Sequence, residues 1–295
     1  MNKPRIVFMG TPDFAVPALQ ALIDRDEDVI GVVTQPDRPV GRGQKLRVTP
    51  VKELAVARGL QVFQPVRVKP SAFVQQLREM QPDLAVVAAY GQLFSQELLN
   101  VPRLGFVNVH SSLLPAYRGA APINRALING DAETGITIMQ LDAGMDTGDM
   151  ILQEKTAILP DENAAALHDR LAALGAVALG RALDLLQGEG WQPVAQDDSL
   201  ATSAPMMKKE DGLVNWKRDA RQIINQVRGM TPWPGCFTYL HGKLFKIHRA
   251  LLLQKSTGGT PGEVVGVSGS GIEVAAGSGM LLLAEVQLEG KKKMS

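Results

Sequence analysis

Short apolar runs alternate with helical patterns over residues 1–187, and this alternation limits the possible folds more than any other feature of the chain. Several runs, such as residues 84–89, are continuous stretches of Val, Leu and Ala, which is typical of strands that are covered on both faces. The expected strands are residues 6–9, 29–34, 61–63, 84–89, 106–109, 137–141 and 150–157. Strands that alternate with helices predict an α/β domain with a doubly wound, mostly parallel, Rossmann-like sheet.

The helical patterns lie between these strands. We expect helices at residues 15–23, 51–58, 71–80, 123–128 and 163–186. The longest carries Leu167, Leu171 and Leu174 at helical spacing, which indicates a face that packs in the core.

The composition changes after this α/β domain. Residues 188–207 are rich in Pro, Gly, Ser and Asp and show no period, so they predict a linker. A helix at residues 218–228 and several short strands with glycine turns follow, which favours a small β-barrel, OB-like domain over residues 208–295.

The overall composition predicts a soluble globular protein. Of the 295 residues, 45% are hydrophobic and 21% are charged, and no apolar run is long enough to cross a membrane. The first residues lead directly into an apolar strand and leave no room for a signal peptide. Cys236 is the only cysteine, so no intrachain disulfide can form, and a reducing cytoplasm is the expected location. We expect a monomer.

Charge is distributed unevenly along the chain. From Lys209 onward there are 12 Lys and Arg against 7 Asp and Glu, or +5, which leaves 19 against 23, or −4, for the rest. A basic C-terminal module suggests a polyanionic partner.

Polar side chains gather where two of the predicted strands end. Asn108 and His110 are two residues apart in an extended segment, so they point to the same side. Residues 135–149 form a second strand and a glycine-rich turn that carries Asp142, Asp146 and Asp149. Ligands of open parallel sheets bind outside the carboxyl ends of the strands. An amide, an imidazole and a carboxylate at that edge suit acyl transfer from one nitrogen to another.

Three other chemistries lack their motifs. The first strand-to-helix turn has Gly10 but no second or third glycine, which argues against a dinucleotide site. The acidic turn lacks a ligand at its third position and has Gln153 in place of the closing Glu, which argues against metal. No G-x-S-x-G sequence occurs, which argues against a serine hydrolase.

The polar motifs resemble those of the formyltransferases that use 10-formyltetrahydrofolate. The resemblance is carried by Asn108-x-His110, Ser112-Leu113-Leu114-Pro115 and Asp142-x-Gly144-x-Asp146-Thr147-Gly148. Within that family, the branch that formylates methionyl-tRNA is similar over nearly the whole chain, in Gly10-Thr11-Pro12-Asp13-Phe14, Gln35-Pro36-Asp37-Arg38-Pro39, Arg118-Gly119-Ala120-Ala121-Pro122-Ile123 and Trp233-Pro234.

The resemblance implies a reaction and a set of residues for it. The formyl group would move from 10-formyltetrahydrofolate to the α-amine of initiator methionyl-tRNA, in support of translation initiation, with no metal. Attack of the amine on the formyl carbon would form an oxyanion, which Asn108 and His110 would stabilise. Asp146 would hold His110 and relay a proton from the amine toward N10 of the folate. The folate-binding residues would be Ala88, Tyr90, Gly91, Ser112, Leu113, Leu114, Pro115 and Asp142.

A basic segment over residues 35–52 carries five cations and only one acid. Its glycines and prolines predict an irregular, flexible loop. The family places a basic loop here against the tRNA acceptor end, so the resemblance implies tRNA contacts for Arg38, Arg42, Lys45 and Arg47, with Arg42 the most intimate. An ordinary solvated loop is the alternative.

The sequence departs from the pattern of the resembling family at two points, and two functions other than formylation of methionyl-tRNA remain as alternatives. Ser111 stands where the family usually has Gly or Ala, and the chain stops at Ser295, short of the usual tail, so we expect the small domain to lack its last element. A formyltransferase for a small amine, such as an amino sugar nucleotide or glycinamide ribonucleotide, and an RNA-binding protein are the alternatives.

Overall fold

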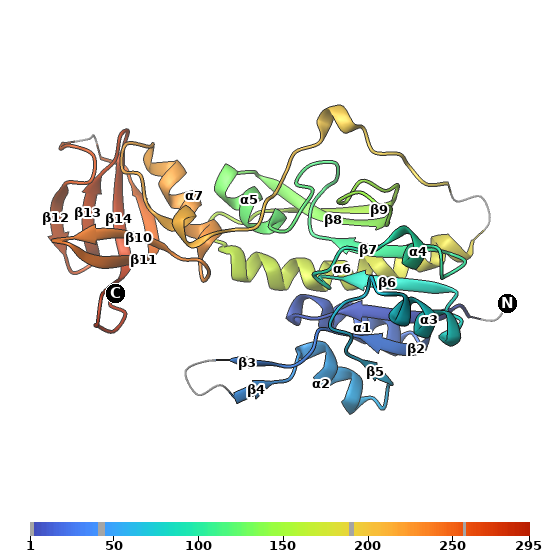
Figure 1. The fold of residues 1–295 in the computed structure, drawn as a ribbon. Helices are drawn as coiled ribbons and strands as arrows, with labels where there is room; N and C mark the ends of the chain where they lie inside the picture. The colour runs from blue at the N-terminus through green and yellow to red at the C-terminus, as the bar shows by residue number, and fades with distance from the viewer. Residues whose placement is uncertain (1–2, 41–44, 189–191, 256–257) are drawn as a thin grey trace. The chain divides into compact units, whose positions relative to one another are not determined.

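The structure, a computed structural model, describes residues 3–40, 45–188, 192–255 and 258–295. Its larger sheet has seven strands in the order β5-β2-β1-β6-β7-β8-β9 (Figure 1). The strands from β5 to β7 pair in parallel, and β8 runs antiparallel to β7. The strands are β1 Arg5–Gly10, β2 Asp28–Val33, β5 Val62–Phe63, β6 Leu84–Ala88, β7 Phe106–His110, β8 Glu133–Gln140 and β9 Met150–Ala157. The predicted mostly parallel α/β sheet is confirmed.

Helices cover this sheet because its central strands are apolar on both faces. All five residues of β6 are buried, and residues of α3 pack against them in one core cluster. On α6, a Cβ added to Gly175 would lie 2.9 Å from Val109 Cγ1, so this helix packs directly on β7. The helices of the chain up to residue 187, whichever sheet they belong to, are α1 Val16–Asp24, α2 Pro50–Ala57, α3 Ser71–Met80, α4 Gln96–Leu99, α5 Pro122–Asn129 and α6 Ala164–Gln187.

The strand order places a switch point between β1 and β6. From β1 the chain first adds β2 on one side and later β6 and β7 on the other. The carboxyl ends of β1 and β6 are Gly10 and Ala88. Ligands of open α/β sheets bind at such a point, so the fold itself directs attention to this edge.

The smaller sheet is antiparallel, with five strands in the order β10-β11-β14-β13-β12. Helix α7, Ala220–Met230, begins at Asp219, whose carboxylate accepts from Arg221 N at 2.8 Å, and contributes Ile223, Ile224 and Val227 to the core. Cys236 is buried in the same core. Closure into a barrel stays a prediction. The strands are β10 Cys236–Leu240, β11 Lys243–Leu253, β12 Val264–Ser268, β13 Gly271–Ala275 and β14 Met280–Leu288.

Contacts divide the chain into two compact units. The first comprises Met1–Arg118, Gly135–Thr156 and Asp169–Ser203, and the second comprises Gly119–Thr134, Ala157–His168 and Ala204–Ser295. Helix α5 therefore belongs with the smaller sheet, where Asn124 Nδ2 donates to Gly229 O at 2.7 Å. The domain boundaries expected at residues 187 and 208 stay a prediction. No helix in the described part of the chain is long and apolar enough to cross a bilayer.

The prediction of an irregular loop over residues 35–52 is wrong. Strands β3, Arg38–Val40, and β4, Lys45–Arg47, form a two-stranded antiparallel ribbon, with Arg38 opposite Arg47. Proline lacks an N–H donor, but each strand of a two-stranded ribbon has an outer edge on which no ladder bond is needed. Pro39 therefore does not prevent the pairing.

Asp83 is expected to contribute to the free energy of unfolding in a way that is lost in acid. Its carboxylate accepts from Arg5 N at 2.8 Å and from Arg103 Nε at 2.6 Å, and these bonds lower its pKa. Because the carboxyl has a lower pKa in the folded protein than in the unfolded chain, where it is about 3.9, the ionised carboxylate stabilises the fold at pH values above the unfolded-state pKa. This contribution to stability is lost as the pH falls through the folded-state pKa. Replacement by Asn should therefore lower the unfolding free energy most above about pH 4.

Urea unfolding between about pH 2 and pH 7 measures this difference. The gap between wild type and Asp83→Asn should narrow as the pH falls, and the exposed Asp28, replaced by Asn, is the matched control. A gap of constant size across this range would contradict the assignment.

Candidate active site

Strand β7 presents Asn108 and His110 on one side of the sheet. Val109, between them, points to the opposite side, where it packs against α6. His110 is buried and ends the strand, and Asn108 is half-buried. The predicted alternation therefore places the amide and the imidazole on the same side of the sheet, at the carboxyl end of β7.

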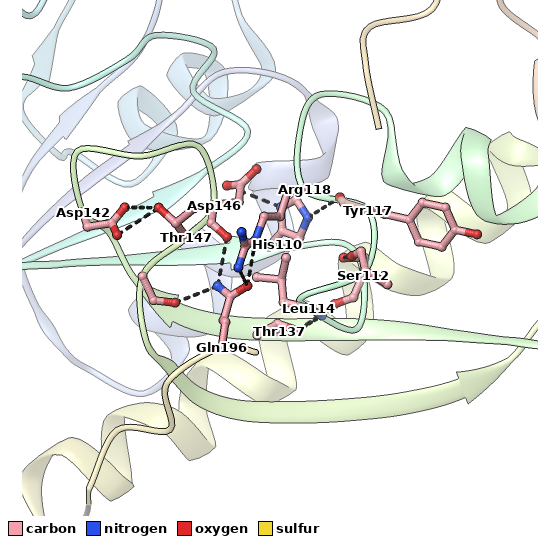
Figure 2. Close-up of polar contacts among 12 residues, drawn as sticks. His110, Ser112, Leu114, Tyr117, Arg118, Thr137, Asp142, Asp146, Thr147 and Gln196 are labelled. Carbon is pink, nitrogen blue, oxygen red and sulfur yellow. Dashed lines mark hydrogen bonds and ion pairs between the residues drawn. The ribbon is translucent and has the colours of Figure 1, made fainter. Parts of the chain in front are cut away.

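The His110 ring has a defined partner at each nitrogen (Figure 2). Nε2 lies 3.0 Å from Tyr117 O, and because a carbonyl oxygen only accepts, Nε2 carries a proton. Nδ1 lies 3.7 Å from Asp146 Oδ1, which is an ion-pair distance rather than a hydrogen bond. The structure thus brings Asp146 to His110, as the sequence predicted.

Asp146 reaches this position from the turn between β8 and β9. It adopts a left-handed backbone conformation, with φ of 55°. Asp142 organises the turn, because its carboxylate accepts from Gly144 N at 2.9 Å and from Thr147 Oγ1 at 2.7 Å. A folate contact by Asp142 stays a prediction, since the bonds described for its carboxylate lie within the turn.

The segment Ser112 to Pro115 is supported from β8. Thr137, fully buried, donates from Oγ1 to Ser112 O at 2.7 Å and accepts from Leu114 N at 3.0 Å. Gln153 Nε2 donates to the same hydroxyl at 3.0 Å. One hydroxyl proton and two lone pairs are thereby all used.

Within that segment the side chains alternate in exposure. Ser112 and Leu114 are buried, and Ser112 Oγ donates to Ala116 O at 2.6 Å. Leu113 and Pro115 are only half-buried. Of the four residues predicted to bind folate here, these two offer side-chain surface, whereas the other two are committed to the interior.

The folate-binding residues predicted at the end of β6 and directly after it divide in the same way. Ala88 and Tyr90 are buried, and the Tyr90 ring stacks on Phe94 with centroids 6.0 Å apart. Burial raises the pKa of the Tyr90 phenol. Gly91 is exposed and lines a cavity of about 600 Å³. The cavity is also lined by Gln35, Arg38, Val66, Arg67, Lys69, Pro70, Gln92 and Leu93, so three cations face a space beside the end of β6.

The predicted tRNA-binding residues lie on the basic ribbon. Arg38 and Arg47 are exposed and opposite each other. Arg42 and the side chain of Lys45 fall outside the described residues, so their predicted contacts stay predictions. The base of the ribbon is fixed by Lys52, whose Nζ lies 2.6 Å from Asp37 Oδ2 and thereby lowers the pKa of that carboxyl.

Sequence reasoning missed a group of residues that support the site. Gln196 donates to Asp146 O at 2.9 Å, and Arg118 donates to Gln196 Oε1 at 3.0 Å from Nε and 2.8 Å from Nη2. Tyr117 N donates to Thr202 Oγ1 at 2.9 Å. Gln196 and Thr202 lie in the predicted linker, whose polar, aperiodic sequence gave no sign of these contacts.

Comparison with known proteins identifies the class to which this fold and site belong. The formyl transferase model matches residues 4–183, and the formyl transferase C-terminal domain model matches residues 206–295. The chain belongs to the formyl transferase family.

Its relatives within the family include proteins named methionyl-tRNA formyltransferase. The protein of Geotalea daltonii is 52% identical over 98% of this chain and 92% of its own length, and that of Geobacter metallireducens is 54% identical over 98% and 93%. The resemblance seen in the motifs is confirmed.

Solved structures share the fold at low sequence identity. A sugar 3N-formyl transferase, solved with dTDP and 5-N-formyl-THF, is 18% identical with a TM-score of 0.73 over 99% of this chain and 100% of its own. HypX from Aquifex aeolicus, solved with tetrahydrofolic acid, is 17% identical with a TM-score of 0.65 over 99% and 45%.

Thr137→Val should destabilise the protein by about 1–3 kcal/mol, because an isosteric methyl leaves buried partners of the hydroxyl unpaired. Denaturant unfolding measures the loss. Thr137→Ser is the matched control, since it keeps the hydroxyl and removes one methyl, at a cost of about 1 kcal/mol. A Val variant as stable as wild type would show that these bonds contribute nothing net.

Proposed function

We propose that this protein transfers the formyl group of 10-formyltetrahydrofolate to the α-amine of initiator methionyl-tRNA. The observations that support the proposal are the 3.7 Å distance between His110 Nδ1 and Asp146 Oδ1 and the position of Asn108 two residues before His110, on the same side of β7. Full-length relatives bearing the name methionyl-tRNA formyltransferase support the choice of acceptor.

The donor substrate would bind beside these residues. The half-buried side chains of Leu113 and Pro115 and the exposed Gly91 offer apolar surface and backbone groups to a pterin ring. Proteins of the same fold were solved in complex with tetrahydrofolic acid and in the presence of 5-N-formyl-THF, which supports a folate donor.

Attack of the amine on the formyl carbon creates a tetrahedral oxyanion. The Asn108 amide donates to that oxygen, and His110, when both of its ring nitrogens carry a proton, adds a charge-assisted donor. Because Nε2 is bound to Tyr117 O, Nδ1 is the nitrogen left for the reacting groups.

Asp146 completes the proton balance. The attacking amine must lose a proton, and N10 of the departing tetrahydrofolate must gain one. Asp146, beside Nδ1, stabilises the charged ring and relays this proton, through water, from the amine toward N10.

The acceptor is assigned to tRNA rather than to a small amine for a reason of charge. The ribbon exposes Arg38 and Arg47, and Lys52 neutralises the single acid of the segment, Asp37. A small amine needs no such cationic surface, whereas the sugar–phosphate backbone of a tRNA does.

The reaction takes place where initiator tRNA is charged, so we assign the protein to the cytoplasm. The expected monomer stays a prediction.

Asn108→Ala and His110→Ala should each lower kcat for formyl transfer by about 10²–10³-fold, because each removes one donor to the oxyanion. Rapid-quench measurement of formylmethionine on tRNA tests this. Asn100→Ala and His241→Ala, at exposed positions, are the matched controls. If either active-site variant keeps a rate within a few-fold of wild type, its assigned role is wrong.

Arg38→Ala and Arg47→Ala should raise KM for tRNA and leave KM for folate unchanged. Removal of one ion pair with a phosphate should also make the slope of log affinity against log salt shallower by about 0.9. Lys155→Ala, an exposed cation on β9, is the control. Unchanged tRNA kinetics and an unchanged salt slope would contradict the role of the ribbon and favour a small acceptor.

A further inference from the structure

We infer that Gln196 is a positioning residue for formyl transfer, which holds the turn of Asp146 so that its carboxylate faces His110. The inference rests on the proposed function. Gln196 lies outside both regions matched by the family models, in the segment that joins them.

The side-chain amide of Gln196 uses its full bonding capacity. Nε2 donates to Asp146 O at 2.9 Å and to Gly148 O at 2.7 Å. Oε1 accepts from Nε and Nη2 of Arg118 at 3.0 Å and 2.8 Å. Two protons and two lone pairs are satisfied, and this pattern fixes which end of the amide faces the turn (Figure 2).

These bonds act on the backbone of the residue whose carboxylate is needed. Asp146 has a φ of 55°, in the left-handed region that non-glycine residues rarely adopt. Gln196 Nε2 donates to the carbonyls of Asp146 and Gly148, so it holds the part of the turn that directly follows this unusual conformation. Rotation of the turn would move Asp146 Oδ1 away from His110 Nδ1, now 3.7 Å distant.

The same segment also supports the other partner. Thr202 Oγ1 accepts from Tyr117 N at 2.9 Å, and Thr202 O accepts from Arg118 N at 2.9 Å. Tyr117 O in turn accepts from His110 Nε2. Both members of the His110–Asp146 pair are therefore positioned by side chains of one segment.

Burial singles out Gln196 from its neighbours. Every other residue between positions 192 and 200 is exposed, whereas Gln196 is half-buried. Arg118, which orients it, also donates to Asp198 Oδ1 at 2.7 Å, so the guanidinium is held independently of the amide.

Two substitutions separate positioning from simple support. Gln196→Met keeps the length of the side chain and removes every hydrogen bond. Gln196→Glu keeps an acceptor for Arg118 and adds a charge to that contact, but it places a carboxylate oxygen against the two carbonyls of the turn. A residue that only anchors Arg118 would tolerate Glu, whereas one that positions Asp146 would not.

Steady-state kinetics of the full-length variants with 10-formyltetrahydrofolate and methionyl-tRNA test the inference. Both substitutions should lower kcat by about 10- to 100-fold, because small displacements of a reacting group have effects of that size, while either KM changes by less than about threefold. Gln192→Met, at an exposed position in the same segment, should behave as wild type.

A double-mutant cycle identifies the residue through which Gln196 acts. If Gln196 acts through Asp146, then Gln196→Glu should change the residual rate of Asp146→Ala by less than about twofold. A full, multiplicative loss in that background would overturn the inference. So would a Gln196→Glu enzyme with wild-type kcat, or the unfolding of both Gln196 variants at the assay temperature, since the amide would then be needed for the fold and not for the rate.

Failure of the proposed function would look different. A wild-type protein that transfers no formyl group to methionyl-tRNA would refute the proposed function before any variant is compared. An active wild type with an insensitive Gln196 would remove only the positioning role.

Discussion

The placement of the His110 ring between the Tyr117 carbonyl and the Asp146 carboxylate is the interaction on which the site depends. The carbonyl fixes the ring and occupies one nitrogen, so the carboxylate faces the other. Neither partner comes from the strand that carries His110. The ring is useful only because two separate turns, at residues 115–118 and 142–148, are held in place around the end of β7.

The fold explains why such turns can be held there. Strand β7 is covered by α6 on one face, where Val109 packs, so its polar residues are confined to the other face. Thr137 on β8 forms hydrogen bonds with the segment after His110. The segment from Gln196 to Thr202 forms hydrogen bonds with both of the turns that surround the His110 ring. A rigid sheet thus supplies the direction of the side chains, and hydrogen bonds from distant segments supply their spacing.

The sequence predicted the part of this arrangement that depends on local pattern. Period-two alternation placed Asn108 and His110 on one side, and continuous apolar runs such as β6 indicated the parallel sheet. It did not predict the β3–β4 ribbon, because Pro39 argued against pairing and the geometry of a two-stranded edge is not visible in composition. It also missed Gln196, since a bond that joins residues 50 positions apart leaves no periodic trace in a polar segment.

Mass spectrometry of the aminoacyl group tests the central claim most directly. The wild-type protein is supplied with 10-formyltetrahydrofolate and charged initiator tRNA. The methionine is then released from the tRNA, and its mass is measured. The account predicts that the methionine α-amine gains one formyl group, and that Asn108→Ala and His110→Ala together abolish this product within the same reaction time. Unmodified methionine with the wild-type protein, or undiminished product with the double variant, would contradict it.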